Sequence, residues 1–327
     1  MLTAFSASGI QSVNPASANC AGSLQAAIWI DLFDPSHEET HAVEAALGIR
    51  LPTRTEVQEI EVSSRLYVEG QTMFMTATVV VQADTRHPET TPVTFAYQPQ
   101  QLVTLRFAEP TPFTTFPPKF QRTPEAFPTA QKVFMGLVDE IIEGVADSLE
   151  SVGSDLNAVS RVIFFADASP QPVKKPTVDY TAMLTRIGRK GERAANARES
   201  LVSISRLLAF FAEAREGLVG EPLDEHWRTV RKDVSALSDH ATFLSNKVNF
   251  FLDATLGRIN IEQNTIIKLF SVLAVVFLPP TLIASIYGMN FEYMPELKWL
   301  FGYPFSLLLI LLSAILPYVV FKRKGWF

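Results

Sequence analysis

The chain has 327 residues, of which 28 are Lys or Arg, 34 are Asp or Glu and one is Cys, so its formal net charge is −6. A single cysteine excludes an intrachain disulfide, and an acidic chain is a poor partner for nucleic acid. Residues 264–327 carry a net charge near +3 and residues 1–263 a net charge near −9, so an acidic part precedes a strongly apolar one.

The N-terminal part predicts an α/β domain. Residues 1–22 are small and polar and lack the basic start and long apolar run of a signal peptide, so we expect a flexible N-terminal tail in the cytoplasm. Residues 26–33 predict a buried strand, and Asp34-Pro35-Ser36 predicts the start of a helix that ends near Leu47. Runs of β-branched and aromatic residues predict further strands at 59–68, 72–82, 93–97 and 102–107. We expect a mixed α/β domain with a largely antiparallel sheet over residues 23–120.

Helical periodicity follows from residue 124 onwards and predicts a helical stalk over residues 121–263. Apolar residues at helical spacing predict a first helix from about 125 to 165, which the prolines of 169–176 must end. A second helix is predicted from about 180 to 216. Its exposed basic face is expected to contain Arg186, Arg189, Lys190, Arg193 and Arg198. A third helix begins near Leu223 and continues to Tyr287, which is about 98 Å if it is unbroken.

Two apolar segments predict a membrane hairpin over residues 264–327. The first, 266–287, has 22 residues with Lys268 as its only formal charge, and as a helix it covers about 33 Å, the thickness of a bilayer's hydrocarbon core. We expect a pore helix at 264–288, an outer loop at 289–303 and a second helix at 304–321. The basic cluster that follows the second helix favours the cytoplasmic side, so both termini are expected there.

The first membrane helix carries a line of small, hydroxyl, amide and bulky apolar residues at helical spacing. We call it the polar line: Asn264, Ile267, Ser271, Ala274, Leu278, Thr281 and Ser285. Two helices cannot enclose a water-filled path, so several copies would have to arrange this helix around an axis. We expect the line to face that path, with Ile267 and Leu278 as constrictions that close by dewetting. The alternative is that the hydroxyls donate to carbonyls of their own helix.

Pro279 and Pro280 lie in the middle of this helix and leave the carbonyls of Val275 and Val276 without their helical donors. Freed carbonyls inside a membrane need partners or a wet cavity. One hypothesis therefore places them beside the pore, and the alternative is a packing kink that neighbouring helices satisfy.

The residues after the first membrane helix resemble those of a known family. Gly288-Met289-Asn290 is followed by FEYMPELKW, FGYP, a second apolar run and FKRKGW, and it is preceded by FLPPTLIASIY. This pattern is similar to the C-terminus of the CorA family of divalent metal ion (Mg²⁺/Co²⁺/Ni²⁺) transporters. The close match covers residues 240–327, and the rest matches in organisation only.

The resemblance implies a funnel-shaped homopentamer in the bacterial inner membrane that imports Mg²⁺, with Co²⁺ and Ni²⁺ as further ions and no organic cofactor. It implies that Asn290 forms a ring around the hydrated ion, that Gly288 permits the sharp turn, and that Met289 packs behind the ring. Since Mg²⁺ dehydrates reluctantly, a neutral amide ring suits its passage. Glu292 and Glu296 are expected to concentrate cations at the outer mouth, or to be ordinary solvated loop residues.

The resemblance also implies closure by cytoplasmic Mg²⁺ bound between neighbouring domains. Candidate ligands are Asp233, Asp239 and Asp253, each of which is otherwise an ordinary helix residue. The chain has no G-x-x-x-x-G-K-[ST] loop, so the membrane potential is the expected driving force. No nucleophile–base motif indicates an enzyme. A zinc transporter of the same superfamily and a membrane-anchored scaffold without a pore are the alternatives, and Phe291-Glu292-Tyr293 favours the magnesium branch.

Overall fold

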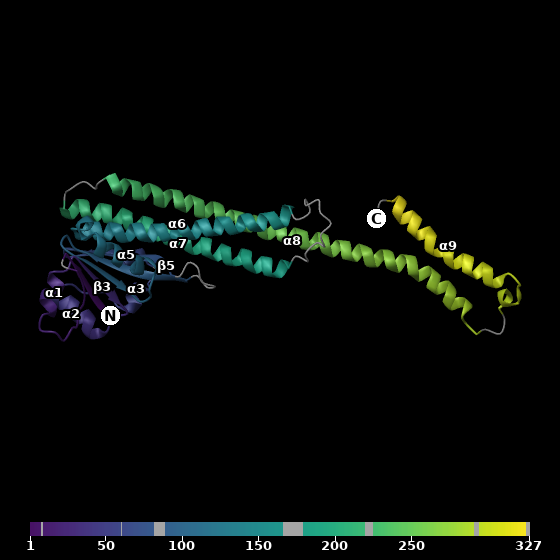
Figure 1. Cartoon of the computed structure of the whole chain (residues 1–327), viewed down its shortest axis with the longest axis horizontal. Helices are drawn as coiled ribbons and strands as arrows, with labels where there is room; N and C mark the ends of the chain where they lie inside the picture. The colour runs from purple at the N-terminus through teal and green to yellow at the C-terminus, as the bar shows by residue number, and fades with distance from the viewer. Residues whose placement is uncertain are drawn as a thin grey trace. The chain divides into compact units, whose positions relative to one another are not determined.

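The computed structural model describes residues 1–7, 9–59, 61–81, 89–165, 179–219, 225–290 and 294–324. The chain divides into two compact units, residues 1–253 and residues 254–327. The expected start of the membrane hairpin, residue 264, therefore lies inside the second unit rather than at its edge. Each unit has its own architecture (Figure 1).

Among the described residues, a mixed sheet of seven strands forms the centre of the first unit. In spatial order they are β2 (Gly9–Ser12), β1 (Leu2–Ser6), β3 (Trp29–Phe33), β7 (Leu102–Arg106), β6 (Glu89–Tyr97), β5 (Thr72–Val81) and β4 (Leu66–Glu69). β3 and β7 pair in parallel, and the other neighbours pair antiparallel. The prediction of an α/β domain with a largely antiparallel sheet is confirmed.

Two local predictions are wrong. Residues 1–22 do not form a flexible tail, because β1 lies between β2 and β3 and helix α1 (Cys20–Gln25) follows. Leu2 and Phe5 are buried on opposite faces of the sheet, so tertiary packing stabilises this short strand. The small and polar residues that follow it along the chain show no strand pattern. The predicted strand at 59–68 is also shorter, since helix α4 (Val62–Arg65) is one turn that leads into β4.

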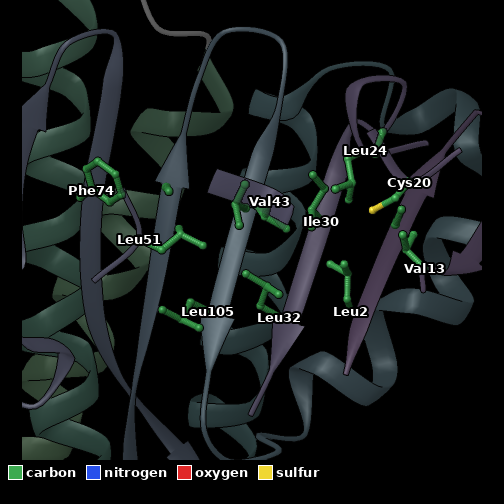
Figure 2. Packing of buried hydrophobic residues seen from close by; sticks show 14 of the residues in the cluster. Leu2, Val13, Cys20, Leu24, Ile30, Leu32, Val43, Leu51, Phe74 and Leu105 are labelled. Carbon is green, nitrogen blue, oxygen red and sulfur yellow. The ribbon is translucent and has the colours of Figure 1, made fainter. Parts of the chain in front are cut away.

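One face of the sheet carries an aliphatic cluster. Figure 2 shows Leu2, Ile30 and Leu32 on neighbouring strands. Helices α2 (His37–Leu47) and α3 (Arg54–Val57) add buried side chains to the same cluster. The predicted start of α2 is confirmed by a capping box, in which the Glu39 backbone N–H donates to Ser36 Oγ at 3.2 Å and the Ser36 N–H donates to the Glu39 carboxylate at 2.9 Å.

The opposite face carries an aromatic cluster beneath helices α5 (Pro112–Arg122), α6 (Ala130–Phe165) and α7 (Tyr180–Val219). Trp29 of β3 packs edge-on against Phe116 of α5, with ring centroids 5.5 Å apart. Phe134 of α6 packs edge-on against Phe95 of β6 and stacks on Phe211 of α7. These contacts join the sheet to the long helices, so the expected boundary at residues 120/121 does not separate two compact units.

A buried ion pair lies at the edge of this aromatic cluster. Arg106 Nη2 donates to Asp31 Oδ2 at 2.8 Å, and Thr104 Oγ1 donates to Asp31 Oδ1 at 2.7 Å. The Arg106 guanidinium also lies 4.4 Å from the ring centroid of Phe33. Both charged side chains are at most 9% exposed. A buried pair is tolerated when hydrogen bonds satisfy both groups, as they do here.

The three long helices predicted at 125–165, 180–216 and 223–287 correspond to α6, α7 and α8 (Glu225–Tyr287). In the first unit, residues 225–253 of α8 lie beside α6 (Figure 1). His226 Nε2 is 2.9 Å from Asp139 Oδ2, and Lys247 Nζ donates to Asn157 Oδ1 at 2.8 Å. The prolines of 169–176, predicted to end the first helix, lie outside the described residues.

The second unit contains the remainder of α8, the short 3-10 helix η2 (Pro295–Lys298) and helix α9 (Gly302–Arg323). The 3-10 helix η1 (Pro124–Ala126) belongs to the first unit. α9 begins before the predicted residue 304 and ends after the predicted residue 321. Its last turn holds Lys322 and Arg323, where basic side chains favour the C-terminal helix dipole.

Candidate ion-conduction site

The apolar part of α8 and the whole of α9 form the candidate membrane segment. Among the described residues, these two helices are long and apolar enough to cross a membrane. None of the residues in their most apolar stretches is buried within the chain. Proteins in water rarely leave apolar surface of this extent uncovered. Lipid or further copies of the chain must therefore cover it.

All seven residues of the polar line lie in α8, and all are exposed within a single chain. At 3.6 residues per turn they share one side of the helix. The half-buried Val272, Val276 and Ile283 fall on the other side. The two expected constrictions are among the most exposed side chains, with Ile267 60% and Leu278 69% exposed. One chain thus presents the polar line to its surroundings.

Two hydroxyls of the polar line donate within their own helix. Ser271 Oγ donates to the carbonyl of Ile267 at 2.8 Å, and Thr281 Oγ1 donates to the carbonyl of Phe277 at 2.7 Å. These bonds are the alternative that the sequence left open. A hydroxyl oxygen keeps lone pairs after its proton is donated, so both residues retain the capacity to accept hydrogen bonds from water around a cation.

The Gly288-Met289-Asn290 segment begins where α8 ends. The Gly288 N–H donates to the carbonyl of Ala284 at 2.9 Å, as in a regular α-helix, and the Met289 N–H donates to the carbonyl of Ile286 at 3.2 Å, a shorter-range bond that tightens the last turn. Gly288 is not among the residues with positive φ, so its role is not a left-handed turn. A Cβ at Gly288 would lie 3.2 Å from the Ala284 carbonyl oxygen, and this close approach favours glycine instead.

Within the described part of one chain, the two side chains that follow Gly288 are exposed. Asn290 is exposed, and the Met289 side chain is 46% exposed. The expected packing of Met289 behind an asparagine ring is therefore not formed by a single copy. Of the two expected mouth glutamates, Glu292 lies outside the described residues, and Glu296 lies in η2.

Pro279 and Pro280 do not end α8, which continues through them to Tyr287. Both prolines are half-buried. Since proline has no N–H to donate, the carbonyls of Val275 and Val276 lack their usual partners from the next turn. The two hypotheses for these carbonyls, pore and packing kink, both invoke groups outside the single chain.

The three aspartates proposed as metal ligands lie on α8 within the first unit. Asp233, Asp239 and Asp253 are all exposed. Within the described ranges, no three His, Cys, Asp or Glu side chains are grouped closely enough to hold a metal ion. The described part of one chain therefore does not bring these aspartates together at one site.

Sequence patterns did not reveal two carboxylates on α6 that bind neighbouring helices. Burial raises the pKa of Asp139, although the hydrogen bond to His226 opposes this shift. Burial would also raise the pKa of Asp155, but hydrogen bonds from Lys190 and Arg186 outweigh it and hold that pKa below its ordinary value.

The predicted exposed basic face of α7 is therefore only partly correct. Lys190, with a side chain 12% exposed, and Arg186 are both bound to Asp155 of α6. Charge alone indicated a solvated face. The acidic partner lies on another helix, and no periodicity within α7 could have found it.

Comparisons with known proteins agree with this architecture. The sequence pattern of a family described as CorA-like Mg²⁺ transporter protein matches residues 25–323. The magnesium transport protein CorA of Yersinia pseudotuberculosis is 36% identical over 303 residues, which cover 93% of each chain. The complete structure of the CorA magnesium transporter from Methanocaldococcus jannaschii has a TM-score of 0.65 at 17% identity, covering 100% of this chain and 98% of that one.

The fold also resembles a protein with a different name. The ZntB cytoplasmic domain from Vibrio parahaemolyticus matches with a TM-score of 0.53 at 10% identity, covering 79% of this chain and 97% of that domain. At this identity the likeness concerns the fold alone. It does not favour one transported ion over another.

Proposed function

Because the chain belongs to the family of CorA-like Mg²⁺ transporter proteins, we propose that it imports hydrated Mg²⁺ across the bacterial inner membrane. The observation that carries the proposal is the polar line of α8, which is exposed on one side of a membrane-length helix and leads to Gly288-Met289-Asn290. Co²⁺ and Ni²⁺ are further candidate ions of the same path.

The proposal requires several copies of the chain, and by resemblance to the family we propose five. Two helices cannot enclose a path, whereas a ring of α8 helices with their polar lines inward can. The exposure of both membrane helices within one chain supports such an assembly. In it, α9 faces lipid, since Leu308, Leu311 and Leu316 present apolar surface without polar interruption.

At the end of the path we propose that Asn290 side chains hold the hydrated ion through its water shell. An amide oxygen accepts hydrogen bonds from that water without stripping it, which suits an ion that dehydrates reluctantly. A carboxylate at the same place would bind more tightly and slow release. Glu292 and Glu296 then raise the cation concentration at the mouth from a short distance.

Further along α8, Ile267 and Leu278 form apolar rings that dewet to close the path. Asn264 forms a second polar ring at the inner end, and Ser271 and Thr281 offer hydroxyl oxygens between them. A divalent cation gains about 4.6 kcal/mol by crossing 100 mV, so an inside-negative potential can drive import. We propose that both termini lie in the cytoplasm, because the basic residues Lys322, Arg323 and Lys324 at the end of α9 favour that side of the membrane.

For regulation, we propose that cytoplasmic Mg²⁺ binds between neighbouring copies and closes the path, with Asp233, Asp239 and Asp253 as candidate ligands. The supporting observation is their exposure on α8. Millimolar Mg²⁺ should protect the full-length protein from limited proteolysis, and Asp253→Asn should weaken that protection. Identical digestion with and without Mg²⁺ would count against this part of the proposal.

The experiment that tests transport compares Mg²⁺ uptake into liposomes by the wild type and by Asn290→Ala, under an inside-negative potential. We expect uptake by the wild type and its loss in the variant. Leu311→Ala, a substitution on the exposed surface of α9, is the matched control and should transport normally. Uptake that survives Asn290→Ala moves the ion site elsewhere along α8. Uptake of Zn²⁺ but not of Mg²⁺ would favour the zinc transporter. No uptake of either ion would favour the membrane-anchored scaffold without a pore.

A further inference from the structure

A basic cavity lies in the first unit, and we call it the arginine pocket. Its volume is about 510 Å³, and its lining includes Arg65, Thr76, Thr78, Arg198, Ser203 and Arg206. β4 pairs with β5 only as far as Met75, so no described strand lies beside β5 beyond that residue on this side. Helix α7 takes that place, and the Thr78 N–H donates to Ser203 Oγ at 2.9 Å.

The pocket is positively charged although the chain as a whole is acidic. It holds three arginines and one carboxylate, that of Glu199. Arg65 is fixed in place, since its Nε donates to the Glu59 carbonyl at 2.6 Å and its Nη1 to Thr78 Oγ1 at 3.1 Å. Arg198 and Arg206 have no ion pair or hydrogen bond within the described part of the chain. Two guanidinium groups are therefore available to a ligand.

The spacing of these two arginines restricts the ligand. They lie eight residues apart on one side of α7, about 12 Å along the helix axis. A ligand with linked anionic groups can bind both guanidinium groups without both long side chains bending toward one point, as a single phosphate would require. Guanidinium forks match phosphate oxygens, and nearby hydroxyls supply further donors. The volume lies within the usual range for small-molecule sites, about 300–1,000 Å³.

We propose that the arginine pocket binds a small molecule with two or more linked phosphate groups, in its Mg²⁺-free form. Mg²⁺ binds phosphate oxygens and cancels part of their charge. A site that relies on arginines therefore binds the metal-free ligand more tightly than its Mg²⁺ complex. When Mg²⁺ is scarce, more of the ligand is metal-free, so its binding can signal Mg²⁺ shortage to the protein. This signalling role rests on the proposed function, whereas the binding itself does not.

The test titrates the full-length protein in detergent with inorganic tripolyphosphate, with and without excess Mg²⁺, by calorimetry. We expect wild-type binding that Mg²⁺ weakens. Combined Arg198→Gln and Arg206→Gln should weaken it at least about tenfold, because each lost charge-assisted bond contributes roughly that factor. Arg189→Gln, an exposed arginine of α7 outside the pocket, is the matched control and should bind as the wild type does.

A second measurement does not depend on variants: orthophosphate should bind the wild type more weakly than tripolyphosphate. Absence of tripolyphosphate binding, equal binding by the double variant, or equal affinity for orthophosphate would each overturn the proposal. A change in assembly size in the double variant, without phosphate binding by the wild type, would show that the pocket is a contact between copies. Liposome uptake of Mg²⁺ is measured separately, so failure of transport and failure of binding are distinguishable.

Discussion

The two units of the chain differ in where their side chains find partners. In residues 1–253 the largest rings, such as Trp29 and Phe134, are fully buried by other parts of the same unit. In residues 254–327 the most apolar stretches have no buried residue. The first unit is therefore stabilised by its own packing. The second unit leaves apolar surface that lipid or further copies must cover, so substitutions in the two units should be detected by different measurements.

The largest effect is expected at the buried ion pair of the first unit. Arg106→Ala leaves the Asp31 carboxylate buried without its cation, which costs about 3–5 kcal/mol in the free energy of unfolding. Arg54→Ala is the control, because Arg54 also lies over a ring, that of Phe107, but its side chain is 63% exposed. It should cost less than about 1 kcal/mol. Urea unfolding of the full-length protein in detergent measures both, and equal costs would contradict the assigned burial.

A smaller effect is expected where α6 approaches the aromatic cluster. A Cβ at Gly136 would lie 2.6 Å from Phe116 Cε2, so Gly136→Ala should destabilise the first unit by about 1–3 kcal/mol. Gly144 of the same helix has no atom within 4 Å of such a Cβ. Gly144→Ala should therefore stabilise by about 0.5–1 kcal/mol through helix propensity. The same urea titration gives the two opposite signs, and a shared sign would refute the packing explanation.

In the second unit a substitution should change transport and leave unfolding of the first unit unchanged. Leu278→Ala widens a proposed constriction. We therefore expect Mg²⁺ uptake to rise several-fold, equivalent to about 1 kcal/mol in the free-energy barrier to passage. Ile283→Ala removes a similar side chain from the other side of α8 and should have little effect. Liposome uptake distinguishes the two. A rise in both variants would indicate a general loosening of the helix.

The smallest effect is a pH dependence of the first unit. The pKa of Asp155 is lowered from 3.8, so its contribution to stability is present above that value and is lost as the pH falls through the lowered pKa. The pKa of Asp139 is raised, so its contribution runs the other way and is lost as the pH rises. Asp155→Asn should therefore flatten the acid side of the stability profile by less than about 1 kcal/mol. An unchanged acid limb, measured by thermal unfolding from about pH 5 down to about pH 2, would contradict this role.

The sequence predicted the long elements well because each carries its own periodic signal. The apolar repeats of α6 and α8 and the β-branched runs of β5 and β7 are examples. β1 was missed because Leu2 and Phe5 owe their burial to β3, which lies more than twenty residues later. The ion pairs of Asp155 with Arg186 and Lys190, and the arginine pocket, were missed for the same reason, since each joins residues of different elements.

At the candidate ion site, in contrast, the sequence indicated the residues and the structure of one chain adds little. Gly288, Met289 and Asn290 were selected from the sequence by resemblance, and the structure adds the close approach of Gly288 to Ala284. Within the described part of the chain Asn290 is exposed. For these residues the periodic pattern and the family resemblance give more information about function than the contacts within one chain do.

The order of the two units along the chain bears on how the protein is made. Helix α8 begins in the packed first unit and ends in the apolar second unit. A ribosome that adds about 5–20 residues per second needs about 4–15 s to complete residues 254–327. The packing of the amino-terminal part of α8 against α6 can therefore begin while residues 254–327 are still being added.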